Sequence, residues 1–132
     1  TSSLVWQALQ IPYSSISISL WVEDEPLVSM VKNIFSVDCF VFSKGKLSTL
    51  NGDIIKTSDK NSVEKSIIAT GFPSNSNITE KNLKRLINNV QKFKKVRAIG
   101  SASLMLAYVA SGIFDAYFED EIYIWDVAAG LG

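Results

Sequence analysis

The sequence predicts an α/β fold, a layered sandwich in which an antiparallel β meander is followed by a mixed α/β sheet layer. Two observations predict it. The first sixty residues contain short apolar runs joined by connections that are too short for parallel crossovers. From residue 61 onward, strand-like and helix-like segments alternate, which is typical of an α/β layer. We therefore assign residues 1–60 to an antiparallel sheet part of the core and residues 61–132 to a C-terminal α/β part.

The clearest strand pattern spans residues 14–22. Its side chains alternate between two sides, with Ile16, Ile18, Leu20 and Val22 on one and Ser15, Ser17, Ser19 and Trp21 on the other. This alternation predicts a strand with one buried face. Upstream, Leu4, Val5, Ala8 and Leu9 could form one face of a short helix that Ile11-Pro12 would end.

Four more short strands complete the predicted meander. A charged turn at residues 23–26 leads to a strand over 27–31, and a third strand is predicted over 37–43. This third strand contains Cys39, which we expect to be buried. Residues 47–50 and 54–56 flank Asn51-Gly52-Asp53, and because Asn and Gly tolerate positive φ this sequence predicts a hairpin.

In the second half, strands are predicted over residues 66–70, 96–99 and 114–118. After a polar loop at 74–77, Asn77 and Glu80 resemble a capping box that starts a helix. The buried stripe of this helix is predicted to contain Leu83, Leu86, Ile87, Val90 and Phe93. A second helix, over residues 101–111, has almost no polar face, so we expect it to be buried on nearly all sides until Gly112 ends it.

Composition excludes several classes of function. Thirteen basic residues balance thirteen acidic ones, so nothing favours nucleic acid as a partner. The chain lacks histidine, the commonest general base and zinc ligand, and its single cysteine excludes a disulfide framework. A reducing, cytoplasmic setting is therefore expected. No stretch approaches the roughly 18 apolar residues of a membrane span, so no membrane partner is expected.

The end of the chain holds the first candidate site. An apolar run stops at Asp126, and small residues follow, which predicts that a helix begins there. Glu119, Asp120 and Glu121 lie within eight residues of it, and Asp115 is close by. Carboxylates without His or Cys favour a hard cation, Mg²⁺ above all. Alternatively, Asp126 is only an N-cap, and the other three form a solvated turn.

A second candidate site is the turn at Gly100, Ser101 and Ala102, where a predicted strand passes into a helix. A helix N-terminus presents free N–H groups and a positive dipole to an anion or a hydroxyl group. The alternative is a plain helix entry with no ligand.

Three segments together resemble the inositol monophosphatase family in order and spacing. They are Arg97-Ala98-Ile99-Gly100-Ser101-Ala102-Ser103, Phe114-Asp115-Ala116-Tyr117-Phe118-Glu119 and Trp125-Asp126-Val127-Ala128-Ala129-Gly130. The last resembles the family's C-terminal signature. Earlier segments, at residues 11–18 and 44–58, are similar to the strand after the family's metal motif and to its usual hairpin, so the resemblance covers roughly residues 11–130.

The resemblance implies a magnesium-dependent, lithium-sensitive phosphomonoesterase in which metal-activated water attacks a phosphate monoester in line. It implies that Asp126 binds a catalytic Mg²⁺ ion and that Glu119 contacts hydroxyls of the substrate alcohol. Gly100, Ser101 and Ala102 would touch the substrate through backbone and side chain. The implied substrate is a small phosphorylated polyol or sugar, such as an inositol monophosphate. Dimers are common in the family, and an exposed edge of the meander offers a surface for a homodimer.

The sequence also departs from the family. The family's other metal ligands lie upstream, in a Gly-Glu motif and in Asp-Pro-Ile-Asp-Gly-Thr, and neither motif occurs here. The sequence also stops about one turn into the helix expected at Asp126. We therefore expect the C-terminal part of a longer phosphatase, truncated at both ends and inactive alone; that longer protein is called the parent enzyme below. The alternative is a non-catalytic remnant that serves as a structural or binding module.

Overall fold

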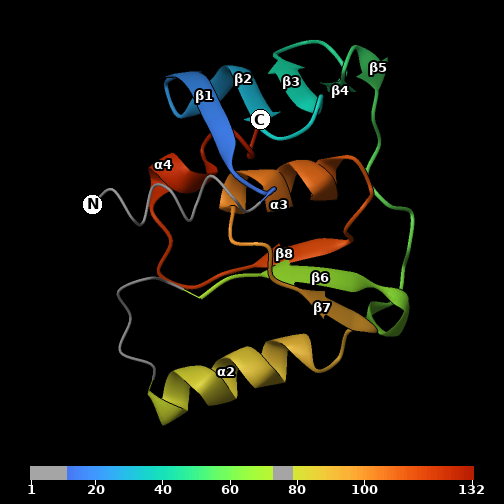
Figure 1. Ribbon diagram of the computed structural model, residues 1–132, viewed down its shortest axis with the longest axis vertical. Coiled ribbons are helices and arrows are strands. Elements are labelled where there is room, and N and C mark those ends of the chain that lie inside the picture. The colour runs from blue at the N-terminus through green and yellow to red at the C-terminus, as the bar shows by residue number, and fades with distance from the viewer. Residues whose placement is uncertain (1–11, 73–78) are drawn as a thin grey trace.

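Two β-sheets lie on either side of a buried helix in the structure, a computed structural model that describes residues 12–72 and 79–132 (Figure 1). The predicted α/β class is confirmed, with an antiparallel sheet from the first half and a parallel sheet from the second. The helix predicted over residues 4–9 and the polar loop at 74–77 lie outside the described residues. Within the described part, no helix is long and apolar enough to cross a membrane.

The larger sheet is the predicted meander. Its five strands pair antiparallel in chain order, and they are β1 (Ser15–Val22), β2 (Glu25–Asn33), β3 (Cys39–Ser43), β4 (Thr49–Leu50) and β5 (Asp53–Ile54). The predicted hairpin at Asn51-Gly52 is confirmed, since both residues have positive φ, 53° and 92°. The predicted charged turn is too long, because Pro26 already belongs to β2 and pairs with Trp21. Cys39, expected to be buried, is half-buried.

The two faces of β1 differ from the arrangement that its sequence suggests. The row with Ile16 and Ile18 is exposed, and the serine row is half-buried against the helical layer. Ser15 hydrogen-bonds Ser103 of the buried helix, with 2.9 Å between the hydroxyl oxygens, and Ser19 hydrogen-bonds Ser29 at 2.8 Å. Small hydroxyl side chains let a helix approach closely, and their mutual hydrogen bonds offset the cost of burying them. Alternation identified the strand but not its inner face.

The opposite side of the larger sheet exposes a group of apolar side chains, called the outer face below. Its members come from neighbouring strands in register: Ile16, Ile18, Leu20, Val22, Val28, Val41 and Ile54, which are exposed, and Met30, which is half-buried. The four β1 side chains are between 50% and 59% exposed. Contiguous apolar surfaces of this kind are uncommon on monomeric soluble proteins and usually mark a contact surface.

We expect the 132-residue chain on its own to bind the dye 8-anilinonaphthalene-1-sulfonate (ANS), because the outer face exposes apolar side chains of adjacent strands. Ile18→Ser with Leu20→Ser should lower ANS fluorescence at least about twofold. Val37→Ser is the matched control, because Val37 is exposed in the β2–β3 loop, outside the outer face. Equal losses in the control and the double variant would assign the dye to another surface.

The smaller sheet has three parallel strands, with β6 (Ile67–Thr70) between β7 (Lys95–Arg97) and β8 (Ala116–Phe118). A short 3₁₀ helix, η1 (Val63–Lys65), precedes β6. The buried helix α3 (Ala102–Ala110) follows β7 and contacts both sheets, and α4 (Ile124–Val127) follows β8 and contacts α3. The remaining helix, α2 (Glu80–Val90), lies on the other side of the smaller sheet (Figure 1).

The core lies between α3 and the larger sheet. Leu104 and Ala107 of α3 pack with Val31 and Phe40 of the sheet and with Ala129 after α4. Tyr108 extends this cluster through edge-to-face contacts with the rings of Phe40 and Phe114, each with centroids 5.7 Å apart. The prediction that this helix is buried is confirmed, because Leu104 and Met105 are at most 1% exposed. Gly112, with φ of 73°, follows the helix as predicted.

Two predictions for α2 are wrong. Its N-cap is Thr79, whose hydroxyl accepts a hydrogen bond from the Asn82 amide at 3.3 Å, whereas Asn77 lies outside the described residues. Its apolar stripe is not buried: Leu83 and Ile87 are exposed, and no residue of the helix is fully covered. Leu86 and Val90 of the stripe are half-buried, so the described part of the chain covers the stripe only partly.

Asp115 anchors β8 to β6 at the end of the smaller sheet where its strands begin. Its carboxylate Oδ2 accepts hydrogen bonds from the Ile67 amide at 2.6 Å and from Lys60 Nζ at 2.9 Å. Burial raises the pKa of this carboxyl, but hydrogen bonds from Ser58, Ile67 and Lys60 outweigh it and hold the pKa below its usual value. Asp115 therefore belongs to the scaffold, although the sequence placed it near the candidate metal site.

Candidate active site

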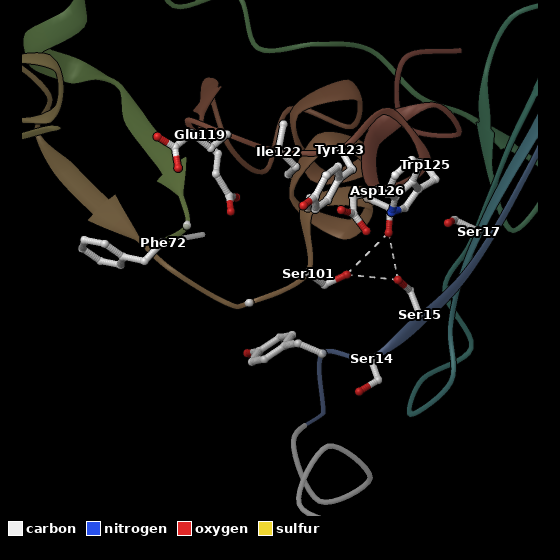
Figure 2. A pocket seen from close by; sticks show the side chains of 16 residues that line it. Ser14, Ser15, Ser17, Phe72, Ser101, Glu119, Ile122, Tyr123, Trp125 and Asp126 are labelled. Atoms are coloured by element: carbon white, nitrogen blue, oxygen red, sulfur yellow. Dashed lines mark hydrogen bonds between the residues drawn. The ribbon is translucent and has the colours of Figure 1, made fainter. Parts of the chain in front are cut away.

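A pocket of about 910 Å³ opens where the parallel strands end (Figure 2). Loops at the carboxyl ends of parallel strands are the usual place for a ligand in α/β proteins. The pocket also takes in the start of β1 and the first turns of α3 and α4. Its lining residues are Tyr13, Ser14, Ser15, Ser17, Gly71, Phe72, Gly100, Ser101, Ala102, Ser103, Glu119, Glu121, Ile122, Tyr123, Trp125 and Asp126. All five predicted site residues are among them.

Asp126 is the third residue of α4, not its first. Tyr123 is the N-cap, and the Asp126 amide donates to the Tyr123 carbonyl at 3.0 Å. In the described part of the chain, no group donates a hydrogen bond to the Asp126 carboxylate, which is exposed to the pocket. The alternative that Asp126 is an N-cap is therefore wrong, and its oxygens are free to meet a ligand. Its position in the first helical turn suits a negative charge.

Glu119 follows β8 and is fixed from two sides. Tyr117 Oη donates a hydrogen bond to Glu119 Oε2 at 2.7 Å. Burial, and then this hydrogen bond and the charge of Glu119, raise the pKa of Tyr117, so its hydroxyl stays protonated and remains a donor. On another side the carboxylate lies against the backbone of Gly71, so close that a Cβ there would come within 2.2 Å of Oε2. Sequence reasoning found Glu119 but missed these two supports.

We expect Gly71→Ala to displace Glu119. The new methyl group would overlap the end of a flexible side chain, so stability should change by less than about 1 kcal/mol while Tyr117 loses its acceptor. Urea unfolding measures the change. Because both substitutions act on the same contact, adding Gly71→Ala to Glu119→Gln should lower the free energy of unfolding by little more than Glu119→Gln alone. Independent, additive effects would contradict this coupling.

A cluster of three hydroxyl groups joins β1 to the start of α3. Ser15 Oγ lies 3.0 Å from Ser101 Oγ and 2.9 Å from Ser103 Oγ, and 3.5 Å separates Ser101 Oγ from Ser103 Oγ, so the three contacts form the triangle of dashed lines in Figure 2. Ser101 is the N-cap of α3, yet its side chain makes no capping bond and turns to Ser15 instead. Gly100, with φ of 79°, provides the turn between β7 and α3. Ser15 and Ser103 were missed, because no local pattern relates residues so far apart in sequence.

The pocket is acidic. Glu119, Glu121 and Asp126 line it, whereas neither Lys nor Arg occurs among its described lining residues. Asp120 points elsewhere and pairs with Arg85 of α2, with 2.5 Å between Oδ2 and Nη2. A phosphate group would be repelled here unless a cation came with it. Within the described residues, no group of three or more His, Cys, Asp or Glu side chains is placed to hold a metal. The carboxylate and hydroxyl oxygens present are the donor type that Mg²⁺ prefers.

Comparison with known proteins gives one consistent result. The model of the inositol monophosphatase family matches residues 8–132. Inositol-1-monophosphatase of Synechocystis sp. is 36% identical over 127 residues, which cover 91% of this chain and 42% of that protein. Nus factor SuhB of Xylella fastidiosa is 34% identical over 121 residues, 91% of this chain and 44% of that protein.

A solved structure agrees with these sequence matches. Inositol monophosphatase from Anabaena (Nostoc) sp. PCC 7120 aligns with a TM-score of 0.86 and 35% identity, over 93% of this chain and 49% of that one. The chain thus spans about half the length of the relatives that it matches.

Proposed function

Because the chain belongs to the inositol monophosphatase family, we propose that its parent enzyme hydrolyses a small phosphate monoester with the help of Mg²⁺. The observation that carries this proposal is the meeting of three separate segments in one acidic pocket. Gly100 to Ala102, Glu119 and Asp126 reach it from the loops after β7 and β8 and from α4.

Each residue has a proposed role that its surroundings support. Asp126, whose carboxylate has no hydrogen-bond donor among the described residues, would hold Mg²⁺. Mg²⁺, when bound, would make a water molecule more acidic and offset the charge of the phosphoryl oxygens. Glu119, held by Tyr117 and Gly71, would accept hydrogen bonds from hydroxyls of the substrate alcohol. The Gly100–Ala102 turn would place backbone N–H groups and the Ser101 hydroxyl against the substrate.

The substrate proposed is an inositol monophosphate or a related polyol or sugar phosphate. We further propose that the parent enzyme is a cytoplasmic homodimer without nucleic-acid or membrane partners. We also propose that the chain divides near residue 60 into two parts. A non-catalytic binding module is the second candidate. It is favoured by the lack of a three-ligand metal cluster in the described part of the chain and by relatives named Nus factor SuhB.

Phosphate release from inositol 1-phosphate, with Mg²⁺ titrated, tests the proposal. The 132-residue chain should release no phosphate, because Asp126 alone is a poor magnesium site. A longer protein that adds the upstream Gly-Glu and Asp-Pro-x-Asp-Gly segments should release phosphate only when Mg²⁺ is present. Release by the short chain would show that it is complete as an enzyme. If neither protein releases phosphate although both are folded, the binding module becomes the better interpretation.

A further inference from the structure

The helix α3 is not capped by the side chain of the serine that precedes it. Ser101 is the N-cap and its backbone is extended, with φ of −132° and ψ of 104°, yet its hydroxyl makes no capping hydrogen bond. A serine in this position normally accepts a hydrogen bond from the second or third amide of the helix. Among the residues that the structure describes, no group accepts from the amides of Ala102, Ser103 and Leu104. Another contact must therefore hold the Ser101 hydroxyl away from them.

Ser15 of β1 provides this contact. Its distances of 3.0 Å to Ser101 Oγ and 2.9 Å to Ser103 Oγ are those of good hydroxyl hydrogen bonds, whereas 3.5 Å between Ser101 Oγ and Ser103 Oγ is long for one. A hydroxyl has one donor and two acceptor sites, so Ser15 can donate to one partner and accept from the other. Ser103 is only 6% exposed and needs a partner inside the protein. Ser15 is therefore the common partner of both hydroxyls.

The Ser101 hydroxyl can adopt two competing arrangements, and they differ in what the pocket presents to a ligand. Figure 2 shows the Ser101 side chain turned toward Ser15 in the pocket that Asp126 also lines. In this arrangement the amides at the start of α3 stay open to a ligand. In the capping arrangement the hydroxyl would cover one of these amides and would leave its present position. The bond to Ser15 selects the first arrangement.

We propose that Ser15 is a positioning residue, which holds the Ser101 hydroxyl in the pocket and keeps it from capping α3. This inference rests on the proposed function, in which the turn from Gly100 to Ala102 touches the substrate. Ser15 acts only through Ser101. Without the Ser15 hydroxyl, Ser101 would accept from an amide of the first helical turn, so the substrate would lose a hydroxyl and an amide contact while Asp126 stays as it is.

Steady-state kinetics of the parent enzyme with inositol 1-phosphate test this role. Ser15→Ala should raise KM about tenfold and change kcat less than about twofold, because contacts that bind the substrate are lost. Ser101→Ala removes the hydroxyl but cannot cover an amide, so KM should rise only about threefold. The double variant should have the KM of Ser101→Ala alone, which means that the second substitution restores part of what Ser15→Ala loses.

Ser19→Ala is the matched control. Ser19 lies in the same row of β1 and hydrogen-bonds Ser29 at 2.8 Å, but it is not among the described residues that line the pocket. It should therefore leave KM unchanged. If the loss of its partner makes Ser103 unfold the Ser15→Ala protein, the same comparison is made in a Ser103→Ala background, where no buried hydroxyl is left unpaired.

Amide hydrogen exchange in the 132-residue chain, followed by NMR, tests the inference without catalysis. Capping by Ser101 in Ser15→Ala should slow the exchange of the Ser103 or the Leu104 amide about fivefold, the factor that corresponds to one capping bond. In the double variant with Ser101→Ala, exchange should return to the wild-type rate, since no hydroxyl remains to form the cap.

The outcomes separate this inference from the proposed function. Independent, multiplying effects of Ser15→Ala and Ser101→Ala on KM, or unchanged amide exchange in Ser15→Ala, would overturn the role of Ser15 and leave the hydrolysis intact. A parent enzyme that hydrolyses no phosphate ester would overturn the proposed function. The exchange rates then decide whether Ser15 prevents the cap, because they need no substrate.

Discussion

Asp126→Asn should abolish phosphate release by the parent enzyme, with kcat lowered at least about a thousandfold. Loss of a metal ion's charge at the reacting phosphate is worth several kcal/mol of barrier, which corresponds to this factor. An amide keeps the shape of the carboxylate but not its charge, so the cation would be held weakly in a pocket that offers no lysine or arginine among its described lining residues. Steady-state phosphate release at several Mg²⁺ concentrations measures the effect, and high Mg²⁺ should restore part of it.

Two measurements distinguish a lost metal ligand from a damaged fold. The Asp126 carboxylate accepts no hydrogen bond from the described residues, so Asp126→Asn should leave the melting temperature within about 2 °C. Asp120→Asn removes an equal charge six residues away, where Asp120 pairs with Arg85 outside the pocket, and it should change kcat less than about threefold. An Asp126→Asn enzyme that keeps more than a tenth of its activity would exclude the proposed role.

Asp115→Asn should lower the free energy of unfolding by about 3 kcal/mol at pH 7. The wild-type side chain is only 6% exposed, and it joins Lys60 to the Ile67 amide across the start of the smaller sheet. The Lys60 side chain is 40% exposed, so the cost comes from weakening two hydrogen bonds to a charged acceptor, from the Ile67 amide and from Lys60, and two such bonds account for this amount. Urea unfolding of the 132-residue chain measures the change, and Asp120→Asn, in a more exposed pair, should cost less than about 1 kcal/mol.

The same substitution predicts a pH dependence. Because folding lowers the pKa of Asp115, its stabilising contribution is complete above the ordinary carboxyl pKa of about 3.9 and is lost as the pH falls through the folded-state pKa. The difference between wild type and Asp115→Asn should therefore be constant from pH 7 to pH 5 and shrink below about pH 4. A difference that grows on acidification would mean that folding raises the pKa of Asp115 instead of lowering it.

Local patterns predicted the elements that local forces determine. The Asn51-Gly52 hairpin needs only two residues that accept positive φ, and α3 is recognisable because its apolar residues have no polar face. The pocket residues Glu119 and Asp126 were found through a short signature and through clustered charge. Each of these features depends on the residues of one short segment, so that segment alone is sufficient to predict it.

What the sequence could not decide depends on contacts between distant segments. The inner face of β1 is its serine row, because Ser103 of α3 is near enough to hydrogen-bond Ser15. Asp115 resembled a further metal ligand until the structure placed it at the far end of β8, bonded to Ile67. The close contact between the Glu119 carboxylate and the Gly71 backbone likewise brings together the loops that follow β8 and β6. To predict any of these contacts, one must know the order of the strands and the position of α3, and no short sequence segment determines either.

The hydroxyl cluster also bears on the order of events during folding. Ser15 lies 86 residues from Ser101 and 88 from Ser103, and the parallel pairs of β6 and β8, such as Ile68 with Ala116, are far apart in sequence as well. Long-range contacts of this kind slow folding, because a large loop must close before any contact compensates for the lost entropy. The meander can form from local hairpins, whereas the pocket forms only after β1 has contacted the start of α3. Its ligand then binds only the completed fold, and binding would draw the folding equilibrium toward the state in which these serines touch.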